Sequence, residues 1–98
     1  MARPEVETGL VALLTPKSPT RLSALRALSR REATQPPTLE AVKLLAEKDE
    51  DAEVRREAVL ALVAWEKRWP ELGTTLDTIA KDDAQTRVRE VATRSKIR

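Results

Sequence analysis

The stretch DEDAEVRREAVLAL, residues 49–62, decides the fold of this 98-residue chain. It opens on acidic residues that suit a turn and a helix N-terminus, and it continues with apolar residues that return every three or four positions. From Ala58 to Trp65 the sequence is apolar almost all round a helix, as expected for an element that neighbours cover on several sides. The stretch therefore predicts a central buried helix in an all-α protein.

The sequence around this stretch repeats with a period of 34 residues. A shift of that size places proline on proline, aspartate on aspartate, arginine on arginine and apolar residues on apolar residues. Because sequence repeats of this length are typically helix pairs, we predict a single domain over residues 1–98, built from three units at about 2–34, 35–69 and 70–98. The matched positions are Pro36 with Pro70, Val42 with Leu76, Leu45 with Ile79, Asp49 with Asp83, Val54 with Val88, Arg21 with Arg55 and Arg89, and Ala24 with Ala58 and Ala92.

Helix boundaries follow from the apolar spacing and from the residues that interrupt it. Pro37 and Pro70 suit the first turn of a helix. Pro16 and Pro19 break the first helix pair, and the acidic run at residues 47–51 supplies a turn and an N-cap. The six expected helices span about residues 4–14, 19–33, 37–48, 52–68, 70–81 and 85–97.

The acidic turn followed by a Val-Arg pair resembles the signature of HEAT repeats. The first unit keeps the arginine but has Thr15 and Thr20 at the Asp and Val positions. The proline found inside the first helix of many HEAT repeats is replaced by Ala41 and Thr75, which resembles the proline-less subgroup related to phycobilisome-lyase repeats. The residues that carry the signature are Asp49, Val54 and Arg55 in the middle unit and Asp83, Val88 and Arg89 in the third.

The resemblance implies a short right-handed α-solenoid of three HEAT-like helix pairs. It also implies a structural ladder between repeats, because an arginine fork can bridge to the turn of the adjacent repeat. A tetratricopeptide array shares the period, but its Trp, Gly and Tyr positions are unmatched here. The ladder residues are Arg21, Asp49, Arg55, Asp83 and Arg89.

In HEAT-like solenoids the helices that open with Val-Arg line the concave surface, which is the usual binding face. Such a face would here combine an aliphatic centre with a basic rim, suited to another protein or to an acidic-apolar peptide. The alternative is that the arginines only keep the face soluble while its aliphatic residues are buried by neighbours. The candidate partner-binding residues are Arg26, Arg56, Leu60, Val63, Lys67 and Arg94.

The charge distribution leaves nucleic-acid binding as the alternative function. Residues 16–35 and 84–98 each carry five basic side chains and one acidic side chain, and a curved helical stack can cradle a phosphate backbone. Against this, the whole chain has a net charge of only +2, and no aromatic residues are placed to stack on bases. We therefore expect a protein partner, with nucleic acid as the second possibility.

The composition argues against catalysis and against a bound cofactor. The chain has no Cys and no His, which removes the commonest general base near neutral pH and the commonest zinc ligands. Gly9 and Gly73 are the only glycines, so there is no glycine-rich phosphate loop. We expect a scaffold or adaptor that is not an enzyme and that uses no cofactor or metal.

The hydropathy pattern predicts a protein that does not cross a membrane. No apolar run approaches the roughly 20 residues that a spanning helix requires. Residues 17–31 are Arg- and Ser-rich like part of a transit peptide, but they fit the first repeat. We expect a cytoplasmic protein, monomeric or weakly homo-oligomeric, with Trp65 and Trp69 in its core or at the edge of the core.

Overall fold

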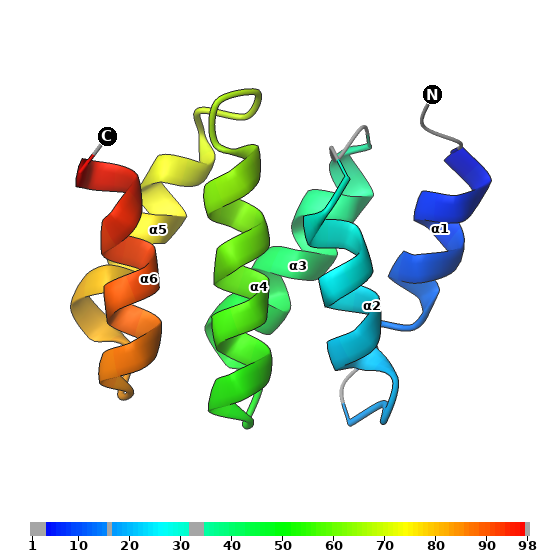
Figure 1. Cartoon of the computed structure of the whole chain (residues 1–98), viewed down its shortest axis with the longest axis horizontal. Coiled ribbons are helices and arrows are strands. Elements are labelled where there is room, and N and C mark those ends of the chain that lie inside the picture. Colours follow the sequence, from blue (N-terminus) through cyan, green and yellow to red (C-terminus); the bar gives the residue numbers. More distant parts are fainter. Residues whose placement is uncertain (1–3, 16, 32–34, 98) are drawn as a thin grey trace.

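The computed structural model describes residues 4–15, 17–31 and 35–97, and over these residues the chain is all-helical (Figure 1). The predicted all-α class is confirmed, and each of the six expected helices has a counterpart in the described residues. The break expected at Pro16 and the last two residues of the helix expected over 19–33 lie outside them. The helices are α1 (Pro4–Ala12), α2 (Arg21–Ser29), α3 (Pro36–Lys48), α4 (Ala52–Trp65), α5 (Leu72–Asp82) and α6 (Thr86–Ile97).

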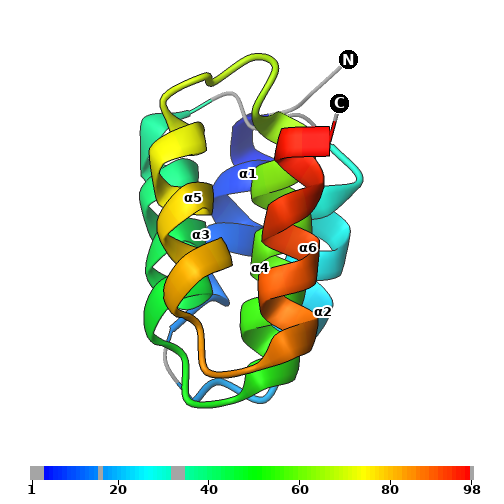
Figure 2. The same ribbon diagram turned by 90° about the vertical axis from the view of Figure 1, so that its left-hand side faces the viewer.

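The helices form two layers. Helices α2, α4 and α6 stand side by side with α4 in the middle, α3 and α5 lie behind them, and α1 closes the N-terminal end against α2 and α3 (Figures 1 and 2). Helix α4 packs extensively on both α2 and α6, whereas α3 touches α1 and α5 only narrowly. The helices of the first layer are therefore packed more closely than those of the second.

One aliphatic core runs through the molecule, and α4 supplies most of its centre. Leu62 is fully buried, and Trp65 is buried at the end of the helix, where its indole N–H donates a hydrogen bond to the Arg31 carbonyl (2.6 Å). Trp69 is half-buried and packs against the core. The alanines at equivalent positions of α2, α4 and α6 are buried alike, at 2% exposure or less: Ala24, Ala58 and Ala92.

Three helices end earlier than the periodicity predicts, and α2 ends at Ser29 instead of about residue 33. Helix α4 ends at Trp65 instead of about residue 68, and residues 66–68 form turns. The Trp65 carbonyl accepts hydrogen bonds from the backbone N–H groups of both Arg68 and Trp69, which closes the helix. Helix α1 ends at Ala12 instead of about residue 14, and tighter three-residue turns follow it.

The acidic turn before α4 supplies the N-cap that its sequence predicts. Asp51 caps α4, and its side chain accepts a hydrogen bond from the Glu53 backbone N–H at 2.9 Å. Pro36 and Pro37 occupy the first turn of α3, where no backbone N–H is needed.

None of the helices within the described ranges is both long enough and apolar enough to cross a membrane.

Candidate functional site

Two ion pairs join successive helix pairs at the acidic turns. Arg21 of α2 donates two hydrogen bonds to Asp49, from Nε to Oδ2 at 2.8 Å and from Nη2 to Oδ1 at 3.2 Å. Arg55 of α4 grips Asp83 in the same way, at 2.9 and 3.4 Å. Such two-point contacts between guanidinium and carboxylate fix orientation as well as charge. Each arginine therefore holds its own helix against the turn of the following helix pair.

The third nitrogen of each guanidinium points back to its own turn. Nη1 of Arg55 donates to the Asp49 carbonyl at 2.8 Å, and Nη1 of Arg89 donates to the Asp83 carbonyl at 2.6 Å. In α2 the corresponding bond goes instead to the Ser18 carbonyl, at 2.8 Å. The first turn thus differs from the other two, as the replacement of aspartate by threonine at position 15 suggests.

The two aspartates sit in matching backbone conformations. Asp49 ends α3 with φ −62° and ψ 139°, and Asp83 ends α5 with φ −64° and ψ 139°. In each case Oδ1 also accepts a backbone N–H two residues on, from Asp51 at 2.9 Å and from Gln85 at 2.8 Å. This local bond helps to orient the carboxylate toward the arginine.

The surroundings of the Arg21–Asp49 ion pair favour the charged form of both side chains. Burial of the Asp49 side chain would by itself raise the pKa of the carboxyl. Hydrogen bonds from Arg21 and from the Asp51 N–H, with the nearby charges of Arg21 and Arg55, outweigh that effect and lower the pKa of Asp49 below its ordinary value. The hydrogen bond to Asp49 is likewise the main cause that raises the pKa of Arg21.

The face of α2, α4 and α6 holds most of the predicted partner-binding residues, but two of its arginines are already paired. Arg26 is half-exposed and donates to Glu57 at 3.2 Å. Arg56 lies 3.4 Å from the other carboxylate oxygen of Glu57 and 3.6 Å from Glu53. Glu57 is mostly buried between these two arginines, so the positive charge of this face is partly neutralised.

The remaining residues of that face divide into exposed and buried. Lys67 and Arg94 are exposed, and Leu60 is half-buried against the core. Val63 was predicted to point outward, and this is wrong because its side chain is only 6% exposed. Helix α4 is covered on both flanks by α2 and α6, so a residue well off the central stripe can still be buried. The aliphatic centre of this face is reduced to Leu60.

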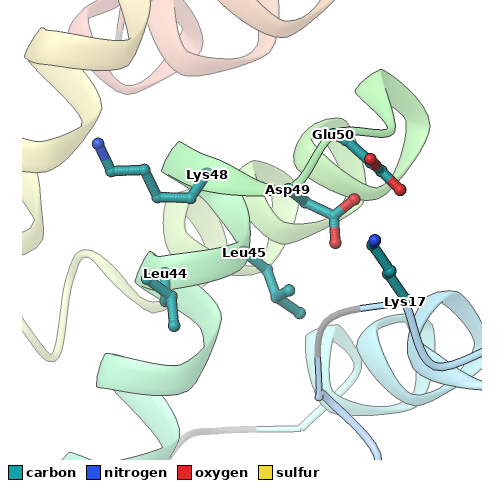
Figure 3. Close-up of a pocket in the computed structure, with 6 residues that line it drawn as sticks. All are labelled: Lys17, Leu44, Leu45, Lys48, Asp49 and Glu50. Carbon is teal, nitrogen blue, oxygen red and sulfur yellow. The ribbon is translucent and has the colours of Figure 1, made fainter.

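A hollow of about 220 Å³ lies elsewhere, between the end of α3 and the turn before α2 (Figure 3). Leu44 and Leu45 form its apolar side, and Leu44 is 54% exposed. Lys17 points toward Asp49 and Glu50 across the hollow, while Lys48 points away from the other lining residues. Lys17 has a positive φ of 67°, which is uncommon for a residue with a side chain.

A buried polar contact between the first two helix pairs was not predicted. Glu7 of α1 is 1% exposed, and its carboxylate accepts hydrogen bonds from the Thr38 hydroxyl and from the Gln35 backbone N–H. In the 34-residue frame Glu7 corresponds to Ala41, and Thr38 corresponds to Leu72. Two polar residues that together replace an apolar pair were the signal that could have revealed this contact.

Among the described residues, no group of His, Cys, Asp and Glu side chains is arranged to hold a metal ion. Comparisons of the chain with models of protein families, with curated proteins and with solved structures found no match. The geometry of the surfaces is therefore the basis for the functional proposal.

Proposed function

We propose that this chain is a non-catalytic protein-binding scaffold or adaptor, built as a short right-handed α-solenoid of three HEAT-like repeats. The ion pairs Arg21–Asp49 and Arg55–Asp83 support this architecture, because each joins equivalent positions of successive helix pairs. Neighbouring helices pack more closely within the layer of α2, α4 and α6 than within the layer of α3 and α5, which favours a stack that curves toward the first layer. The cytoplasm is the proposed location.

The binding face proposed is the outer surface of α2, α4 and α6. Exposed Arg26 and Arg94 occupy in α2 and α6 the repeat position that half-buried Leu60 occupies in α4, and exposed Lys67 follows the end of α4. This arrangement is the observation that carries the proposal, because one apolar anchor within a basic rim suits an acidic-apolar helix or peptide. Rim charges of this kind act mainly on the association rate and on specificity.

The alternative is a nucleic-acid partner, and the ion pairs on the proposed face argue against it. Glu57 lies between Arg26 and Arg56, and its carboxylate would face any phosphate that these arginines approached. Phosphate binding would also require a steep loss of affinity with salt. The two functions can therefore be separated by a salt titration.

The test selects peptides from a random display library on the wild-type protein and measures the recovered peptides by fluorescence polarisation. We expect peptides that combine acidic and aliphatic residues. The double variant Arg26→Glu/Arg94→Glu should bind them about tenfold more weakly or worse, because two rim attractions become repulsions. A matched control is Lys48→Glu/Lys81→Glu, which makes the same charge change at exposed positions of α3 and α5 and should bind like the wild type.

Equal loss in both double variants would contradict the proposal, since it would report net charge and not a face. Recovery of peptides without acidic residues would contradict it as well. Leu60→Ala separates the two contributions, because it removes the anchor and leaves the rim charges in place. We expect it to weaken binding several-fold at every salt concentration.

A further inference from the structure

Arg89 occupies in α6 the place that Arg21 and Arg55 occupy in α2 and α4, yet its guanidinium holds no carboxylate in the described part of the chain. Nη1 donates to the Asp83 carbonyl, and Nη2 donates to the Thr86 hydroxyl at 3.0 Å. Nε meets no acceptor among the described residues. The edge formed by Nε and Nη2 is the edge that grips aspartate in the other two arginines.

A shallow hollow of about 520 Å³ surrounds this guanidinium on the outer side of α5 and α6. Its position matches the surface on which the third helix pair packs against the second. There the equivalent residues Ala46 and Val59 are fully buried, and Arg55 reaches across to Asp83. The residues that line the hollow are Ala80, Thr86, Arg89, Glu90, Thr93 and Arg94.

Two substitutions make this face polar. Thr93 stands where the middle unit has Val59, and Arg94 stands where it has Leu60. An apolar helix pair would therefore gain little by stacking here, whereas the second cation favours an acidic group. Glu90 lines the same hollow and partly offsets the positive charge of the two arginines.

We propose that Arg89 and the hollow around it form a docking site for a helical partner protein that presents an aspartate in the turn before a helix. The chain itself shows how such a turn binds. At the position equivalent to Arg89, Arg21 binds the turn at Asp49 and Arg55 binds the turn at Asp83. In both turns the aspartate is also bonded to a backbone N–H two residues on, so the site recognises an oriented carboxylate.

A second copy of this chain does not supply that turn. The first helix pair has Thr15 at the aspartate position, and Asp49 and Asp83 are already held by Arg21 and Arg55. The inference does not rest on the proposed function, which uses a different face. Because Arg94 borders both surfaces, the test depends on Arg89.

The test follows the side-chain Nε–Hε signals of the arginines by ¹H–¹⁵N NMR in the intact protein. The probe is a synthetic peptide with the sequence of residues 70–97, which carries the Asp83 turn together with α5 and α6 on either side of it, and its control is the same peptide with Asp83→Asn. We expect the Arg89 signal to move downfield on titration, with a Kd on the order of millimolar for a single charge-assisted contact of this kind. The asparagine peptide should bind about tenfold more weakly or worse.

Protein variants separate the site from non-specific attraction. Arg89→Gln should lose the binding, and Arg89→Lys should keep only part of it because the two-point geometry is gone. Lys81→Gln, a control that removes one exposed charge from α5, should bind like the wild type. Circular dichroism confirms that each variant is folded, and the wild-type Arg89 signal is a readout that needs no variant.

The proposal is overturned if the Arg89 signal does not move at millimolar peptide, if both peptides move it equally, or if Arg89→Gln still binds. Inorganic phosphate at matched ionic strength is titrated in parallel. An equal response to phosphate would show a general anion site and would refute the docking of an oriented turn. A shift that depends on protein concentration without peptide would assign the face to self-association and would refute a separate partner.

Discussion

Arginines that look alike in the sequence have different ion-pair partners and different exposure in the structure. Arg21 and Arg55 are largely buried and hold carboxylates of the next helix pair, whereas Arg26 is half-exposed and shares Glu57 with Arg56. The difference follows from helix position. Arg26 follows Arg21 by five residues and Arg56 follows Arg55 by one, so each points from its helix in a different direction from the arginine that reaches the next turn.

Asp49 gives a pH dependence whose sign can be stated. Because the pKa of Asp49 is lowered in the folded protein, its stabilising contribution is complete above the pKa of the unfolded chain, near 4, and is lost as the pH falls through the folded-state pKa. We expect Asp49→Asn to reduce the free energy of unfolding by about 1–2 kcal/mol at pH 7.

The difference in the free energy of unfolding between wild type and Asp49→Asn should shrink as the pH falls below about 4, because the wild-type carboxyl then also becomes neutral. Urea denaturation at several pH values measures this. The control is Asp82→Asn, which removes an exposed carboxyl outside the ion pairs and should follow the wild type. A constant difference between Asp49→Asn and wild type down to pH 2 would contradict the assignment.

At the scale of the helix, α4 shows what periodicity predicts and what it leaves open. The stripe through Ala58, Leu62 and Trp65 was expected to be buried, and it is. Val63 was expected to be exposed because it lies off that stripe, but the flanking helices bury it. A sequence pattern gives the direction in which a side chain points from its own helix, and it does not give how closely the neighbouring helices approach.

The same substitution at Leu62 and at Leu60 tests the orientation of α4, because the two leucines lie on one helix but differ in burial. Leu62 is fully buried, so Leu62→Ala should lower the free energy of unfolding by about 2–5 kcal/mol, since it leaves a cavity in the centre of the core. Leu60 is half-buried, and Leu60→Ala should cost roughly 1 kcal/mol. Chemical denaturation measures both, and equal costs would show that α4 is not oriented as described.

At the scale of the whole molecule, the 34-residue period was enough to predict an all-α fold and the approximate place of its helices. The surfaces were less predictable. Leu44 is the most exposed of the large hydrophobic residues described, although its neighbour Leu45 lies in the core. Glu7 and Thr38 are buried although both are polar. Those outcomes depend on contacts between helix pairs, which a pattern within one pair does not contain.

Successive helix pairs are joined in register by an arginine of one pair and an aspartate of the next. A double-mutant cycle on Arg55→Ala and Asp83→Ala, followed by urea denaturation, tests it most directly, with Arg21→Ala and Asp83→Ala as the cycle for an unpaired combination. We expect a coupling of about 0.5–3 kcal/mol between Arg55 and Asp83 and additive effects for Arg21 with Asp83. Additivity in the first cycle, or equal coupling in both, would contradict it.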